Sequence, residues 1–75
     1  MNLVIRDFWH ESKHCNLTEG QPCGGPVIYQ DAGYKSVDDM RRELKRRFPH
    51  RNVTDISGGV RCEGNHGTYQ EVTLE

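Results

Sequence analysis

The sequence predicts a small α+β domain over residues 1–75, an antiparallel sheet carrying one amphipathic helix in the order β-β-α-β-β-β. Two observations support this fold class. Short runs of β-branched and aromatic residues occur on both sides of a single helical pattern, and glycine-rich separators divide the C-terminal third into hairpin-sized pieces. A chain of this length is near the size at which one core supplies only about 3 to 5 kcal/mol of net stability, so a single domain is expected.

The first two strands are expected at residues 2–9 and 26–30, on either side of a long polar loop. Residues 2–9 (NLVIRDFW) place apolar side chains on both faces of a strand, and residues 26–30 (PVIYQ) are typical of a pleated surface. Between them, from about residue 10 to residue 25, the periodicity disappears and the segment ends in GQPCGG. This stretch predicts a loop of about fifteen residues, long enough to suggest a function or a constraint.

Residues 36–48 (SVDDMRRELKRRF) predict the helix. Ser36 can cap the first free amides, and Asp39 stands three residues later in a capping-box position. Pro49 is expected to end the helix, because it removes a donor and disfavours the helical state at Phe48. One apolar stripe, spaced by three, four and four residues, should face the sheet: Val37, Met40, Leu44 and Phe48.

The last three strands are expected within residues 52–74. Short β-prone runs are separated there by Ser57-Gly58-Gly59 and by Gly64-Asn65-His66-Gly67. Both separators have turn chemistry, which predicts two hairpins in series.

The helix is the only positively charged region. Residues 36–51 carry six basic and three acidic side chains, whereas the rest of the chain has an acidic excess and the whole chain a net charge of -1. The expected contact surface lies away from the apolar stripe and consists of Arg41, Arg42, Lys45 and Arg46, with Arg51 at its edge. Such a surface could meet an acidic protein, which is the expected partner, or nucleic acid, which is the alternative.

An ordinary solvated helix also explains these charges. Basic residues near the C-terminus complement the helix dipole without any ligand. Two i, i+4 ion pairs are expected on the exposed side, Asp38 with Arg42 and Glu43 with Arg47.

The string His10-Glu11-Ser12-Lys13-His14 matches H-E-x-x-H, the basis of an alternative function as a zinc-dependent hydrolase. On a helix, His10 and His14 would bind zinc and Glu11 would act as general base. The flanking residues lack an apolar stripe to hold such a helix, and no third ligand is indicated by spacing. We therefore expect no enzyme activity and no metal cofactor.

A structural zinc site is a second metal hypothesis, formed by Cys15, Cys23, Cys62 and His66. Cys15 and Cys23 are separated by seven residues instead of the two to four typical of a zinc knuckle. A disulfide between these two cysteines is a further alternative, and free thiols are the expectation.

No apolar run approaches the roughly 18 residues of a membrane span, and the N-terminus lacks the pattern of a secretion signal. The expectation is a cytoplasmic protein without a membrane partner. Its expected function is that of a small non-enzymatic interaction or regulatory module, of the kind met among accessory proteins of bacteria and their phages, by analogy only.

Overall fold

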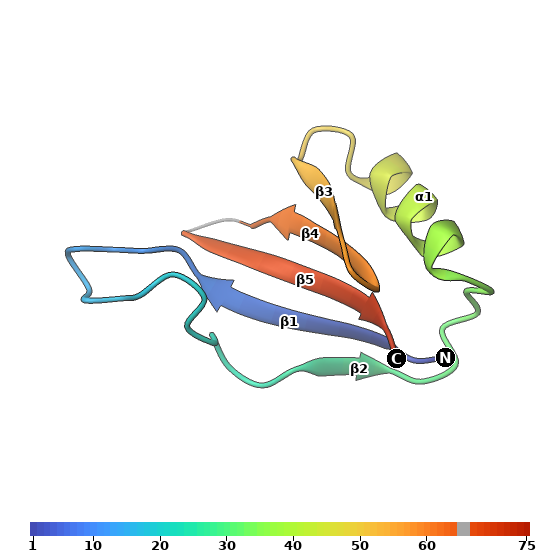
Figure 1. The fold of residues 1–75 in the computed structure, drawn as a ribbon, viewed down its shortest axis with the longest axis horizontal. Helices are drawn as coiled ribbons and strands as arrows, with labels where there is room; N and C mark the ends of the chain where they lie inside the picture. The colour runs from blue at the N-terminus through green and yellow to red at the C-terminus, as the bar shows by residue number, and fades with distance from the viewer. Residues whose placement is uncertain (65–66) are drawn as a thin grey trace.

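The computed structural model describes residues 1–64 and 67–75, and it has a five-stranded antiparallel sheet with one helix on one face (Figure 1). This confirms the expected α+β fold. The order β-β-α-β-β-β is also confirmed by the elements β1 (Leu3–Trp9), β2 (Val27–Tyr29), α1 (Val37–Arg47), β3 (Val53–Ile56), β4 (Gly59–Glu63) and β5 (Thr68–Leu74).

The first and last strands are neighbours inside the sheet, whose order is β2-β1-β5-β4-β3. β1 and β5 pair along their whole length, from Leu3 opposite Leu74 to Trp9 opposite Thr68. Beyond them, Asn2 and Glu75 exchange backbone hydrogen bonds of 2.6 and 2.8 Å, so the two ends of the chain lie side by side (Figure 1). The edges of the sheet are therefore β2 and β3.

The helix begins and ends as its sequence predicts. Ser36 is the N-cap, and its Oγ accepts a hydrogen bond of 3.1 Å from the backbone amide of Asp39. At the other end, the amide of Phe48 donates to the carbonyl of Leu44 over 3.0 Å. Pro49 follows directly, and the backbone of Phe48 has left the helical region.

The core lies between α1 and the sheet. Met40 and Val60 are fully buried, and Leu44, Cys62, Val72 and Leu74 complete the buried cluster. The prediction that the whole apolar stripe faces the sheet is wrong at one position, because Phe48 is 38% exposed. Its backbone is no longer helical, so its side chain does not continue the row that Met40 and Leu44 form.

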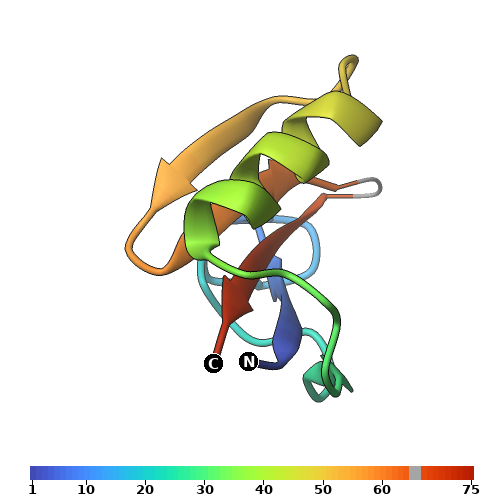
Figure 2. The same ribbon diagram turned by 90° about the vertical axis from the view of Figure 1, so that its right-hand side faces the viewer.

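The helix covers only part of the sheet. The backbone of α1 comes close to β3, β4 and β5, but among the described residues it does not reach β1 or β2. Figure 2 shows the helix in front of the sheet, with β3 to its left. The β1–β2 side of the same sheet face is therefore without a helix of its own.

The loop expected at residues 10–25 is an irregular hairpin that extends beyond the end of the sheet (Figure 1). Ser12 and Leu17 exchange two backbone hydrogen bonds of 3.0 Å across its tip. Its returning arm pairs with the end of β1, because the amide of Trp9 donates to Gln21 and the amide of Cys23 donates to Asp7, both over 2.9 Å. Residues 65 and 66 of the second glycine-rich separator lie outside the described residues.

Candidate functional site

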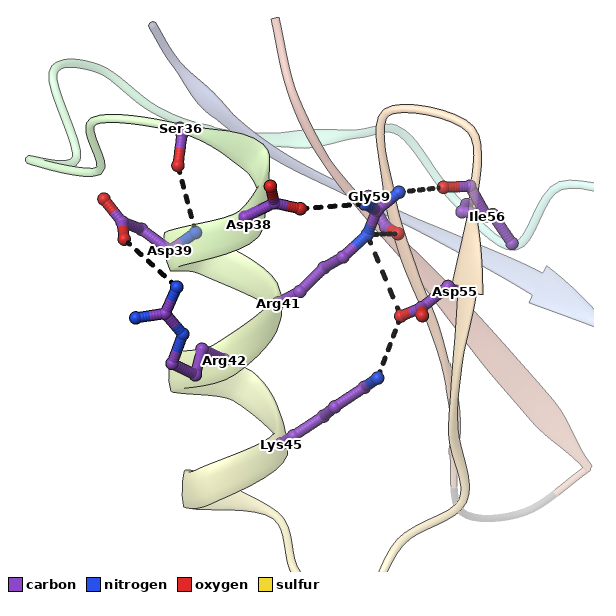
Figure 3. Close-up of polar contacts among 9 residues, drawn as sticks. All are labelled: Ser36, Asp38, Asp39, Arg41, Arg42, Lys45, Asp55, Ile56 and Gly59. Atoms are coloured by element: carbon purple, nitrogen blue, oxygen red, sulfur yellow. Dashed lines mark hydrogen bonds and ion pairs between the residues drawn. The ribbon is translucent and has the colours of Figure 1, made fainter.

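Two of the predicted contact residues, Arg41 and Lys45, are bound to the protein itself. Arg41 donates from Nε to the carbonyl of Gly59 over 3.0 Å and from Nη2 to the carbonyl of Ile56 over 2.6 Å. Lys45 Nζ lies 3.0 Å from Oδ1 of Asp55 on β3. Both side chains reach from α1 toward the β3–β4 hairpin (Figure 3). These two side chains hold the helix to the sheet. They are therefore not part of the contact surface that the sequence predicts.

Arg42 and Arg46 lie on the outer side of the helix, and their side chains are 79% and 71% exposed. Arg42 is 4.0 Å from Asp39 and points away from the hairpin (Figure 3). The expected pair of Asp38 with Arg42 is wrong, because Asp38 lies 3.3 Å from Arg41 instead. The side chain of Arg41 points toward the β3–β4 hairpin, and the carboxylate of Asp38, one turn earlier, pairs with it.

Glu43 is shared by two arginines. Its Oε1 accepts from Arg46 Nη2 over 2.7 Å and from Arg47 Nε over 2.9 Å, which confirms the expected Glu43–Arg47 pair. The hydrogen bond from Arg46, followed by that from Arg47, holds the pKa of Glu43 below its usual value. The same contact raises the pKa of Arg46.

Arg51, which the sequence places at the edge of the basic surface, packs on Phe48. Its guanidinium carbon lies 5.2 Å from the centre of the Phe48 ring, a cation–π geometry. The exposed arginines of α1 and of the segment that follows it are named here the basic rim: Arg42, Arg46, Arg47 and Arg51.

An apolar groove of about 600 Å³ lies beside the basic rim. Its floor is formed by residues of β1, β4 and β5, where α1 leaves the sheet face open. Its walls are the end of α1 and the segment that includes Tyr29 and follows it, and Arg47 and Arg51 are among the lining residues. A second hollow, lined by Arg42, Arg46 and Arg47, shares Tyr34 with it. The main apolar lining of this groove consists of Leu3, Ile5, Tyr29, Tyr34, Phe48 and Val72.

Sequence reasoning missed the groove. The exposed run Val27-Ile28-Tyr29 is visible in the sequence as three apolar residues in a row, a pattern that by itself predicts only a strand. A run of this kind at a sheet edge is the signal that could have indicated a contact surface.

The H-E-x-x-H residues do not lie on a helix. Residues 12–17 form the tip of the irregular hairpin, and both Glu11, just before the tip, and His14, within it, are exposed. Nε2 of His10 lies 2.8 Å from Oε2 of Glu63, and the His10 ring packs 5.0 Å from the ring of Tyr69. His10 thus anchors the hairpin to the sheet. The zinc-hydrolase alternative gains no support from this arrangement.

The three cysteines are free and far from equivalent. Cys15 is exposed, Cys23 is half-buried and Cys62 belongs to the core. All three thiols are free, so the structure does not contain the alternative Cys15–Cys23 disulfide. Burial raises the pKa of the Cys62 thiol. His66, the fourth member of the hypothetical zinc set, lies outside the described residues. Within residues 1–64 and 67–75, no three His, Cys, Asp or Glu side chains are grouped to hold a metal ion; that no cofactor is bound stays a prediction.

The one helix of the described chain is too short and too polar to cross a membrane. Comparison with protein-family models, with curated proteins and with solved structures finds no match to this chain.

Proposed function

We propose that the chain is a small non-enzymatic interaction module that binds an acidic segment of a protein partner. Its contact surface is the basic rim together with the apolar groove. The observation that carries this proposal is the juxtaposition of the two: Arg47 and Arg51 line the apolar groove, and Arg42 and Arg46 line the adjoining hollow that shares Arg47 with it. The basic rim differs from the contact surface that the sequence predicts in two ways: it lacks Arg41 and Lys45, and it includes Arg47.

The apolar lining supports a protein partner. Binding energy at protein interfaces is concentrated in aromatic residues and arginines that are buried on contact, and Tyr29, Tyr34 and Phe48 line this groove beside Arg47 and Arg51. A partner side chain entering the groove would remove apolar surface from water on both molecules.

The local charge argues against nucleic acid. The four arginines of the basic rim stand beside Asp39 and Glu43, which offset half of their charge. A phosphate backbone is bound through many cations at once, and the surrounding carboxylates would repel it. A protein carboxylate needs one guanidinium, which can bind it with two parallel hydrogen bonds.

The free thiols suit a reducing compartment. Cytoplasmic proteins keep their cysteines reduced, and all three cysteines of this chain are unpaired. The unpaired thiols support a cytoplasmic setting for this interaction, which we propose.

Affinity capture from cell extract, read by quantitative mass spectrometry, tests the proposal. The double variant Arg42→Glu/Arg46→Glu reverses the charge of two arginines of the basic rim, and the control Lys13→Glu reverses an exposed lysine on the irregular hairpin, away from the groove. We expect a defined protein to be captured by the wild type and by the lysine variant and lost from the rim variant. Capture that is unchanged in the rim variant would contradict the proposal. So would tight binding of duplex DNA or RNA that weakens steeply with salt and depends on Arg42 and Arg46.

A further inference from the structure

We infer that the apolar groove receives an amphipathic helix of the partner, with an acidic flank, which completes the helical layer over the sheet. This inference rests on the proposed function and names the form of the segment that is bound. It is carried by the uncovered half of the sheet, by the residues that line it and by the position of the charges beside it.

The uncovered area has the width of one helix. Strands lie about 4.8 Å apart, so five of them span about 20 Å, whereas a helix with its side chains is about 10 Å wide. A single helix therefore covers about half of a five-stranded sheet. α1 lies over β3, β4 and β5, and the remaining half is formed by β1 and β2.

The floor of the groove continues the core. Leu3 is paired with Leu74 and Ile5 with Val72, so these side chains lie on the same face as the buried residues under α1. Leu3 and Ile5 pack against the core at one side but are only half-buried, and Tyr29 beside them is 52% exposed. A second helix would bury all three.

The charge pattern sets the character of this helix. Arg47 and Arg51 border the groove on the α1 side, with Arg42 and Arg46 farther along the helix. A helix lying beside α1 would turn one flank toward these arginines. The bound helix should therefore carry apolar residues at i, i+3, i+4 and i+7 and Asp or Glu along one flank.

Two other occupants fit less well. A strand added to β2 would extend the sheet sideways and leave Leu3 and Ile5 uncovered, and β2 offers only three residues for pairing. A second copy of this chain would bring its own basic rim toward the first one, because the only described helix it could insert is α1. Like charges in contact would oppose that association.

Neighbouring residues on β2 give a matched pair of variants. Tyr29 lines the groove, whereas Ile28 points to the opposite face of the sheet, and the two are 52% and 54% exposed. Substitution of either by serine removes an exposed apolar side chain from the same short edge strand. The effects of the two on folding should therefore be alike, and circular dichroism and urea unfolding check that they are.

The test selects binders from a displayed library of randomised helical peptides on immobilised wild-type protein. We expect the selected peptides to carry the apolar spacing and the acidic flank described above. Their Kd should rise by about tenfold or more with Tyr29→Ser and by less than about twofold with Ile28→Ser. Selected peptides without these features, or peptides that lose equal affinity with both variants, would overturn the inference. New protection of the β2 amides from hydrogen exchange on binding would indicate strand addition, with the same consequence.

The same variants separate this inference from the proposed function. If the natural partner is lost from Arg42→Glu/Arg46→Glu but kept by Tyr29→Ser, the basic rim binds the partner and the inference of a partner helix in the groove is wrong. If the capture is unchanged in both, the proposed function fails together with the inference. Loss of the partner from both, with retention by Ile28→Ser, supports the two together.

Discussion

Nε of Arg41 donates a hydrogen bond of 3.0 Å to the backbone carbonyl of Gly59, and this contact joins the middle of α1 to the start of β4. The same guanidinium donates to Ile56, the last residue of β3, so it spans the β3–β4 turn (Figure 3). Ile56 and Gly59 are the paired residues that close the β3–β4 hairpin, so this contact ties α1 to the end of that hairpin. One of the six basic residues of the helical region is thereby part of the scaffold.

Arg41→Ala should lower the free energy of unfolding by about 1 to 3 kcal/mol, because two hydrogen bonds from a charged donor to backbone carbonyls are lost. Arg42→Ala is the matched control on the exposed side and should change it by no more than about 0.5 kcal/mol. Urea unfolding of the three proteins measures both effects. Equal stabilities of the two variants would show that Arg41 does not anchor the helix.

Leu44→Ala should cost about 2 to 4 kcal/mol, since Leu44 is buried under α1 and its truncation leaves a cavity. Phe48→Ala should cost less than about 1 kcal/mol, because that ring lies at the open groove and is exposed. Thermal and urea unfolding distinguish the two. A larger loss for Phe48→Ala would restore the four-residue apolar stripe that the sequence predicts.

The pKa of Glu43 should lie below its usual value. Arg46→Ala should raise this pKa more than Arg47→Ala does, because the hydrogen bond from Arg46 is the larger cause of the lowered pKa. A carboxyl group with a lowered pKa in the folded state adds stability that is present above the unfolded pKa and lost as the pH falls through the folded one. The difference in stability between wild type and Glu43→Gln should therefore shrink on acidification from pH 6 to pH 3. Carbon-detected NMR titration of the side-chain carboxyl and unfolding at the two pH values are the measurements.

The three thiols should react at different rates with iodoacetamide at pH 8. Cys15 is exposed and should be alkylated first, whereas Cys62 is buried in the core and its raised pKa leaves less thiolate. Mass spectrometry of timed samples gives the order. Urea should remove the difference, and a Cys62 that reacts as fast as Cys15 in the native protein would contradict its place in the core.

The sequence was sufficient for the elements whose signals are local. Ser36 and Pro49 bound the helix, Met40 and Leu44 show its buried side, and the glycine-rich separator at 57–59 gives the β3–β4 hairpin. The two glycines of that separator have different roles. Gly58 adopts a φ of 79° in the turn, whereas a Cβ on Gly59 would lie 1.9 Å from the carbonyl oxygen of Val72 on β5.

The site could be predicted only in part, because its composition depends on contacts between distant segments. On an isolated helix, four basic residues look equivalent: Arg41, Arg42, Lys45 and Arg46. The β3–β4 hairpin makes them different, because it brings Asp55 and two backbone carbonyls to the side of α1 that carries Arg41 and Lys45. The groove likewise depends on the strand order. Pairing of β1 with β5 places β2 at the edge and beyond the reach of α1, and no local pattern encodes that arrangement.

Chemical-shift mapping tests the central claim most directly. A selected acidic helical peptide is titrated into ¹⁵N-labelled protein, and amide shifts are followed across the described chain. Binding in the apolar groove predicts the largest changes at Leu3, Ile5, Tyr29 and Phe48, with Arg47 and Arg51, all of which line it. Changes centred instead on the opposite face of the sheet, around Phe8, Arg61 and Tyr69, would contradict the account.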